Sequence, residues 1–242
     1  MNNSDSVLIK ITNENQLNNV SDENYEKFNN FIFSNDLKLT GKMLHRFQHF
    51  LNVKHLPGDI VEVGVFKGSG MSTFLKFIEI FCPNSNKKVL GFDIFDTEKS
   101  AHILTKDSEL DQMYMNRVYD RVNRNELTVN SVTERLKTIS TDKFKLVDGD
   151  VELTLPVFLK ENPGFRASLI YIDVDLERPT YHTLMNLWDR LLPGGVVLFD
   201  EYEYHAFSES SGAERFFKER NIKYNLISTD WIAPTAFIVK DN

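Results

Sequence analysis

Residues 57–70 read PGDIVEVGVFKGSG, and this stretch decides the fold that the rest of the chain adopts. Residues 59–65 form an apolar run typical of a buried strand, and glycines are frequent in the turn from Gly64 to Gly70. A helical pattern over residues 71–81 follows the turn. Glycines after a strand let the backbone come close to a ligand, and the next helix begins with unpaired N–H groups. The stretch therefore predicts a strand, a ligand-binding turn and a helix.

The alternation of strand and helix continues along the chain. Because most of the apolar runs are continuous, both faces of the sheet are expected to be covered by helices. The fold class is therefore predicted as α/β and Rossmann-like, with a doubly wound, mostly parallel seven-stranded sheet. The further strands are predicted at 88–95, 143–150, 167–175, 196–202, 223–229 and 235–240.

The chain is predicted to consist of one domain with two additions. The polar residues 1–40 form an N-terminal arm or lid, within which residues 7–11 are a candidate short strand. Residues 41–242 form the Rossmann-like domain, which opens with a helix over 41–53. Within it, the charged residues 96–142 are predicted as a helical insert. The arm and the insert together are expected to cover the substrate.

Two local signals refine this outline. Helical patterns near 109–122 and 130–139 predict the helices of the insert. Pro193–Gly195 are expected to end a helix over 179–191, before the strand at 196–202 begins.

The composition excludes several classes of protein. The 242 residues carry 28 basic and 35 acidic side chains, a net charge of −7, which argues against binding nucleic acid through phosphate contacts. The single cysteine, Cys82, excludes an intramolecular disulfide and a multi-cysteine zinc site, and it suits a reducing cytoplasm, the expected location. No apolar run approaches the roughly 18 residues of a membrane-spanning helix, so no membrane partner is expected.

The spacing of the glycines limits which ligand the turn fits. The turn reads Glu62-x-Gly64-x-x-x-Gly68 and so lacks the G-x-G-x-x-G spacing of the dinucleotide fingerprint. It resembles the first motif of the Rossmann-like S-adenosylmethionine-dependent methyltransferases. That resemblance implies that Glu62, Gly64, Gly68 and Ser69 belong to the cofactor site, and a tight turn without a ligand is the alternative.

Two acids after later strands are candidates for the same cofactor. Asp93 ends the second predicted strand, where a carboxylate can accept hydrogen bonds from both ribose hydroxyls of NAD or S-adenosylmethionine. Asp150 follows the third strand, and in the methyltransferase interpretation its carboxylate accepts the amino hydrogens of adenine. The alternative for each is structural, because Asp93 can cap the next loop and Asp150 stands where a helix N-cap belongs.

The acids at the ends of the fourth and fifth strands give the sharpest signal. Asp173 and Asp175 end one strand, Asp200 and Glu201 end its predicted neighbour, and parallel strands end at one edge of the sheet. Three carboxylates in one place repel each other unless a cation or protons compensate them. An all-oxygen ligand set selects a hard ion such as Mg²⁺, Ca²⁺ or Mn²⁺. Asp175 is expected to lie beyond the others, and solvated loop acids are the alternative.

Candidate general bases lie near the same strand ends. Asp173 is one candidate proton acceptor, and His205 follows the acidic pair in a loop expected to border the substrate. His102 in the insert is a further candidate. His45 and His49 have metal-ligand spacing but no third ligand beside them, so a structural role is expected for that pair.

Four stretches together resemble the macrocin O-methyltransferase (TylF-type) family. They are PGDIVEVGVFKGSG (57–70), GFDIFD (91–96), YIDVDLERPTYHTL (171–184) and PGGVVLFDEY (193–202), and the likeness runs from about Met43 to about Arg220. The resemblance implies that Asp173, Asp200 and Glu201 bind magnesium. Glu201 departs from the Asp-Asp-Tyr of many members and is one methylene longer.

The resemblance implies an S-adenosylmethionine- and Mg²⁺-dependent O-methyltransferase that acts on a sugar hydroxyl of a small-molecule natural product, and it suggests a homo-oligomer. The first 40 residues and the insert match no pattern of the family, so the acceptor is not identified. Three alternatives stay open: a catechol-type O-methyltransferase, a non-catalytic Rossmann-like binding module, and an NAD-dependent sugar-modifying enzyme, against which the glycine spacing argues.

Overall fold

The computed structural model describes residues 22–241 of a chain that divides into two compact units. The first unit, residues 1–40, contains α3 (Asp22–Ile32), a helix that buries none of its side chains. The helix α4 (Leu37–Val53) begins in the first unit and continues into the second, which holds the rest of the chain. The candidate strand at 7–11 lies outside the described residues, and the lid role of the first unit stays a prediction.

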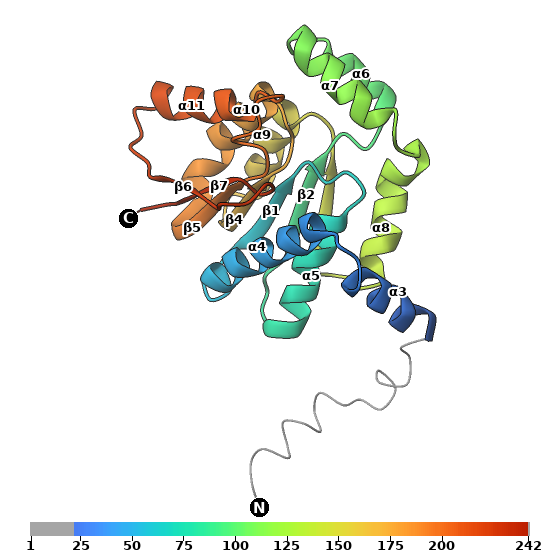
Figure 1. Cartoon of the computed structure of the whole chain (residues 1–242). Helices are drawn as coiled ribbons and strands as arrows, with labels where there is room; N and C mark the ends of the chain where they lie inside the picture. Colours follow the sequence, from blue (N-terminus) through green and yellow to red (C-terminus); the bar gives the residue numbers. More distant parts are fainter. Residues whose placement is uncertain (1–21, 242) are drawn as a thin grey trace, which may run out of the picture. The chain divides into compact units, whose positions relative to one another are not determined.

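Seven strands of the second unit form one sheet, in the order β3-β2-β1-β4-β5-β7-β6 (Figure 1). Neighbouring strands from β1 to β5 pair in parallel, whereas β7 is antiparallel to both β5 and β6. This arrangement confirms the predicted doubly wound, mostly parallel sheet of a Rossmann-like α/β fold. The strands are β1 (Asp59–Val63), β2 (Val89–Asp93), β3 (Phe144–Asp148), β4 (Ala167–Ile172), β5 (Leu191–Phe199), β6 (Leu226–Ser228) and β7 (Ala236–Val239).

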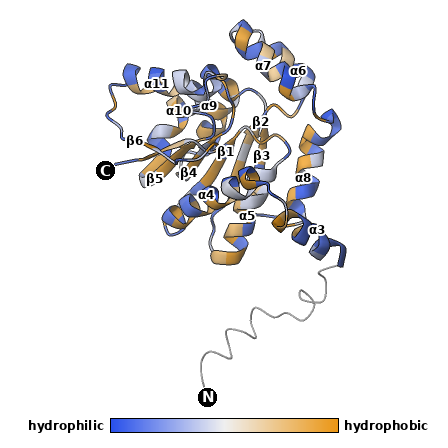
Figure 2. Cartoon of the chain, in the orientation of Figure 1, coloured by the Kyte–Doolittle hydropathy of each residue, from blue (hydrophilic) through white to orange (hydrophobic). Residues whose placement is uncertain are grey.

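Helices cover both faces of this sheet, as the continuously apolar strands predict. One face packs on α4, α5 and α8 through buried residues such as Phe50 and Phe74, and the other packs on α9, α10 and α11 through residues such as Leu155 and Phe216. Figure 2 shows hydrophobic strands enclosed by helices with hydrophilic outer faces. Within residues 22–241, no helix combines the length and the apolar character needed to cross a bilayer. The remaining helices of the layers are α5 (Ser69–Phe81), α8 (Val129–Lys137), α9 (Val151–Glu161), α10 (Glu177–Leu187) and α11 (Glu209–Glu219), and short 3-10 helices lie at Arg124–Leu127 and Trp188–Arg190.

The winding of the chain reverses between β1 and β4, and the ligand crevice of such sheets lies at this switch point. Here the ends of the two strands approach very closely. Gly64 adopts a φ of +91°, and a Cβ at this position would overlap the carbonyl oxygen of Asp173. A glycine is therefore needed at Gly64 for a backbone contact between two strands, before any ligand is considered.

The insert, residues 96–142, has two structural roles. The helix α6 (Thr97–Leu104), which the sequence patterns did not predict, begins where the Asp96 carboxylate accepts hydrogen bonds from backbone N–H groups of its first turn. The helix α7 (Glu109–Tyr119) follows it. By contrast, α8 packs into the core of the sheet, where Val132 is fully buried. A substrate cover thus stays a prediction for α6 and α7, whereas α8 belongs to a helical layer.

The strand β5 differs from the sequence-based expectation. It begins at Leu191 and contains Pro193–Gly195, which were expected to precede a strand at 196–202. In this part β5 advances five residues while β4 advances two, so β5 bulges out of the sheet. Gly194 accommodates the bulge with a φ of +76°.

The close contact at Gly64 makes a prediction about stability. We expect Gly64→Ala to lower the free energy of unfolding by about 3 kcal/mol or more, because the new Cβ meets backbone that cannot move aside and the positive φ is strained. Denaturant-induced unfolding measures the change. Gly164→Ala is the matched control, since a Cβ at Gly164 meets nothing within 4 Å and is expected to change stability by less than about 0.5 kcal/mol. Equal stability of the two variants would contradict this account of the switch point.

Candidate functional site

The end of β1 places a carboxyl group beneath the glycine turn. Glu62 is 1% exposed, and Gly70 in the first turn of α5 leaves room for its carboxyl group, which a Cβ at Gly70 would overlap. Glu62 Oε1 lies 3.9 Å from the Arg46 guanidinium, and Oε2 accepts no hydrogen bond from the described residues. Burial raises the pKa of Glu62 to about 8. Glu62 thus lies under the turn, and its expected contact with a cofactor stays a prediction.

The N-terminus of α5 presents backbone donors above this carboxyl group. Gly68 is its N-cap residue, with a φ of +86°, and no side chain caps the helix. The first N–H groups of α5, beginning with Ser69, therefore face the turn without a side-chain partner. Gly68 and Ser69 are expected to contact the cofactor through the backbone, which the observed geometry permits.

Asp93 ends β2 directly beside the turn. Its Oδ2 accepts a hydrogen bond from the N–H of Phe66 at 2.6 Å, and its Oδ1 accepts one from Ile94 at 2.6 Å. Burial raises the pKa of Asp93. A carboxylate offers about four lone-pair sites, so hydrogen-bonding capacity for a ribose hydroxyl stays available beyond the backbone donors Phe66, Ile94 and Val65. Asp93 both fixes the turn and suits the role expected from the sequence.

Asp150 is held by the protein itself. Its Oδ1 caps α9 by accepting the N–H of Glu152 at 3.1 Å, as the structural alternative for this residue predicts. Its Oδ2 accepts a hydrogen bond from Arg178 at 2.9 Å and lies 3.7 Å from Lys106. A contact of Asp150 with adenine stays a prediction. In that contact adenine would donate to carboxylate oxygens that already accept hydrogen bonds from Glu152 and Arg178.

Arg178 connects the insert to the sheet, a role that sequence analysis missed. Besides Asp150, its guanidinium binds Glu152 at 3.0 Å and Asp107, in the loop between α6 and α7, at 3.2 Å. A second link joins Ser208, after β5, to Asp111 of α7 at 3.0 Å. The insert is therefore tied to the loops that follow β3, β4 and β5.

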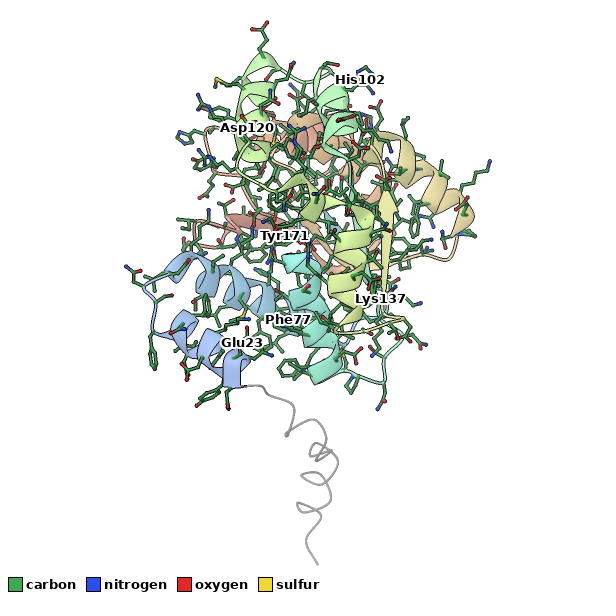
Figure 3. The ribbon with its side chains drawn as sticks, turned by 90° about the vertical axis from the view of Figure 1, so that its right-hand side faces the viewer. Glu23, Phe77, His102, Asp120, Lys137 and Tyr171 are labelled. Atoms are coloured by element: carbon green, nitrogen blue, oxygen red, sulfur yellow. The ribbon has the colours of Figure 1, made fainter. Side chains whose placement is uncertain are left out.

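A lysine from α4 lies between the acids at the ends of β4 and β5. The Lys42 ammonium donates to Asp173 Oδ2 at 3.1 Å and to Asp200 Oδ2 at 2.6 Å. Asp200 Oδ1 accepts a short hydrogen bond from the hydroxyl group of Tyr171, a fully buried residue that Figure 3 labels. Burial and the neighbouring Asp173 raise the pKa of Asp200. The two aspartates thus converge on one cation, which belongs to the chain itself, and the metal ion expected there stays a prediction.

Arg46 follows Lys42 by one helical turn and adds a second positive charge. Its guanidinium lies 4.7 Å above the centre of the Tyr171 ring and 3.7 Å from Asp173. Arg46 shares the inward face of α4 with Phe50 and Val53, at helical spacing. Basic residues within the apolar stripe of a helix are the sequence signal that could have identified both cations.

Asp175 and Glu209 extend the acidic cluster. Asp175 was expected to lie beyond the other acids because a regular strand was predicted up to this residue. The strand β4 ends at Ile172, however, and Asp175 adopts a φ of +66°, so it does not have strand geometry. Burial, together with the charges of Asp173 and Glu201, raises the pKa of Asp175 well above its usual range.

Glu209, the first residue of α11, is fully buried, and its Oε1 accepts the backbone N–H of Glu201 at 3.0 Å. Burial raises the pKa of Glu209 well above its usual range, and the nearby charge of Asp175 adds to the shift. Glu209 is therefore a buried acid that fixes the backbone beside Asp200, and no sequence motif marks it.

The cluster fits a hard divalent cation in part. Among residues 22–241, no three histidine, cysteine, aspartate or glutamate side chains are arranged to hold a metal ion together. Asp173 and Asp200 nevertheless point at one position, which the Lys42 ammonium fills as a stand-in cation. Their oxygens are the ligands that Mg²⁺ prefers. The pair fits the ion once Lys42 leaves, whereas Glu201 as a third ligand stays a prediction.

A cleft of about 570 Å³ lies in the segment that follows Glu201, and the exposed His205 lies in its wall. Aromatic and acidic side chains line it, a combination that suits a polar ligand with an apolar face. His102 lies on α6, away from Tyr171 (Figure 3), and the role of a general base stays a prediction for His205 and for His102. The lining residues are Tyr202, Glu203, Tyr204, His205, Phe207, Ser210 and Glu214.

The buried carboxyl of Glu62 makes the stability of the protein depend on pH. Because its pKa is raised to about 8, the folded chain keeps a proton that the unfolded chain loses near pH 4.5, and stability falls as the pH rises through this window. We expect Glu62→Gln to gain stability relative to the parent between pH 5 and pH 8, by about 1 kcal/mol or more. Thermal or denaturant unfolding at each pH measures this gain. Glu134→Gln, on the exposed side of α8, should follow the parent, and a Glu62→Gln profile parallel to the parent would disprove the shift.

Comparison with known proteins places this geometry in a family. The model of the macrocin-O-methyltransferase (TylF) family matches residues 37–237. A Streptomyces olivaceus protein, 8-demethyl-8-(2,3-dimethoxy-alpha-L-rhamnosyl)-tetracenomycin-C 4'-O-methyltransferase, is 29% identical over 157 residues, which are 62% of this chain and 55% of that protein. The chain therefore spans little more than half the length of that relative.

Solved structures show the same fold. The calicheamicin methyltransferase CalS11 superimposes with a TM-score of 0.68 at 23% identity, over 93% of this chain and 89% of that one. The O-methyltransferase NovP gives a TM-score of 0.66 at 18% identity, over 83% and 79% of the two chains. Since the family model covers most of the sequence and confirms the resemblance stated for its motifs, the chain belongs to the macrocin-O-methyltransferase (TylF) family.

Proposed function

We propose that this chain transfers the methyl group of S-adenosylmethionine to a hydroxyl group of a sugar, with a hard divalent cation such as Mg²⁺ at Asp173 and Asp200. One observation carries the proposal. The backbone of Gly64 touches that of Asp173, so the glycine turn that suits the donor and the acids that suit the acceptor follow two adjacent strand ends. A methyl transfer needs this proximity, because the acceptor oxygen, the methyl carbon and the sulfur must lie in line.

The sugar acceptor is inferred from the cleft and from the relatives. Tyr204 and Phe207 expose aromatic rings that can pack on the apolar face of a sugar, and Glu203 and Glu214 can accept hydrogen bonds from its hydroxyls. The Streptomyces olivaceus relative is named for methylation of a rhamnosyl compound, and a second CalS11 structure, with a TM-score of 0.63 at 23% identity over 92% of this chain and 89% of that one, is described as a TDP-rhamnose 3'-O-methyltransferase.

Different residues bind the donor and accept the proton in the proposed reaction. The carboxylate of Asp93 accepts the ribose hydroxyls of the donor, and the uncapped N-terminus of α5 offers N–H groups beside it. The acceptor hydroxyl must lose a proton when its oxygen bonds to the methyl carbon. Asp173 takes this proton, and His205 in the cleft wall offers a route to solvent. A divalent cation bound at Asp173 and Asp200 supplies Lewis-acid chemistry that makes a hydroxyl easier to deprotonate.

An assay of methyl transfer tests the function directly. With labelled S-adenosylmethionine, we expect transfer to rhamnosyl compounds and deoxysugar nucleotides in the presence of Mg²⁺, and little transfer to catechol. Asp173→Asn should lower kcat about 100-fold or more, because it removes both a cation ligand and a proton acceptor. Transfer that is unchanged both by Asp173→Asn and by EDTA would refute the role of the cation, and catechol as the better acceptor would refute the sugar.

Binding of the donor is tested separately. We expect Asp93→Asn to weaken the binding of S-adenosylhomocysteine, measured by calorimetry, by about tenfold or more, because the amide loses the charge that strengthens two ribose hydrogen bonds. Asp59→Asn is the matched control. Asp59 also accepts a backbone N–H, that of Lys88, but stands at the opposite end of β1. Equal affinities of the two variants would show that Asp93 only supports the turn.

A further inference from the structure

We infer that the Lys42 ammonium occupies the position at which the divalent cation binds, so that Lys42 and the cation exclude each other at Asp173 and Asp200. This inference rests on the proposed function, because it concerns the cation of that site. It assigns to Lys42 the role of a tethered competitor, which sets how tightly the enzyme holds its metal ion.

The distances leave room for one cation. The ammonium lies 2.6 Å from Asp200 Oδ2 and 3.1 Å from Asp173 Oδ2, in the gap between the two oxygens. A Mg²⁺ ion ligated by the same two oxygens must lie about 2.1 Å from each, and therefore in the same gap. Two cations in that gap would overlap and repel each other. Binding of the metal thus requires the Lys42 side chain to move out.

The two cations of α4 differ in their freedom to move. The Arg46 side chain is 7% exposed and is held between the Tyr171 ring and two carboxyl groups, Glu62 and Asp173. The Lys42 side chain is 20% exposed and carries its charge on a flexible four-carbon stem. Arg46 is therefore the fixed charge of the cluster and Lys42 the movable one.

Lys42 also stabilises the positions of Asp173 and Asp200 when no metal ion is bound. Tyr171 holds Asp200 from one side and Lys42 from the other, so Asp200 has partners on both oxygens without any metal ion. Paired carboxylates do not need the ion for folding, in contrast to sites whose ligands fold only around a metal. The expected cost is a weaker apparent affinity, because the ion must first break the hydrogen bonds of Lys42.

Metal binding measured by calorimetry tests the competition. We expect Lys42→Gln to bind Mg²⁺ or Mn²⁺ about ten- to a hundredfold more tightly than the parent, the range set by the loss of a charged hydrogen bond. Lys76→Gln removes the same charge from the exposed side of α5 and should leave the affinity unchanged.

A chemical readout separates displacement from a general effect of charge. Acylation of the parent enzyme, followed by mass spectrometry, should modify Lys42 slowly without metal and severalfold faster with Mg²⁺, because the displaced side chain is exposed. Lys76 should react at one rate throughout. Tighter binding by Lys42→Gln with no change in the acylation of Lys42 would overturn the exclusion and leave only a charge effect.

Thermal unfolding covers the case in which the variant is unstable. Adding Mg²⁺ in place of EDTA should raise the melting temperature of the parent by less than that of Lys42→Gln, which should melt below the parent in EDTA and recover when Mg²⁺ is added. Lys42→Gln that binds metal no more tightly than the parent overturns the inference, while the cation of the proposed function stands. If neither protein binds Mg²⁺ or Mn²⁺, both the competition and the cation of the proposed function are refuted. An assay of methyl transfer in EDTA then tests whether the chain is a methyltransferase without a cation.

Discussion

The compensation of buried negative charge is the constraint on which the site depends. The sheet brings carboxyl groups from β1, β4, β5 and α11 to one edge, and the pKa values of Glu62, Asp175 and Glu209 are all raised there by burial. Two cations, Lys42 and Arg46, do not balance this cluster. Burial therefore favours the protonated form of these three carboxyl groups, which lessens the repulsion between the acids at this edge.

This constraint makes α4 part of the site although it precedes the sheet. The helix supplies both cations, and its apolar residues pack against the same face of the sheet as α5. The burial of Phe50 and the position of Lys42 are thus parts of one arrangement, because a helix that did not pack would leave Asp173 and Asp200 to repel each other. Packing and electrostatics stabilise the same element here.

The sequence predicted what local patterns determine. Continuous apolar runs located the strands. The acids that follow them lie together at the carboxyl ends of the strands, because parallel strands all end at the same edge of a sheet. Lys42 was missed because its partners lie 131 and 158 residues away, beyond any periodicity. The turn at Asp175 was missed because the prediction extended a regular strand past Ile172, where the backbone turns to a positive φ. The side-chain partners of a residue such as Lys42, and a turn made by a single residue, can be identified only from the three-dimensional structure.

The carboxyl groups at this edge also have a consequence for the course of the proposed reaction. The donor carries a positive sulfonium, which the acidic edge attracts, whereas the demethylated product is a neutral thioether. Methyl transfer therefore removes the positive charge of the sulfonium from the crevice and releases the proton of the acceptor hydroxyl, which Asp173 takes in the proposed reaction. The crevice thus favours the charged donor over the spent one, and the same acids that attract the donor receive the proton. Charge compensation therefore links binding of the donor, loss of the proton and release of the product in one site.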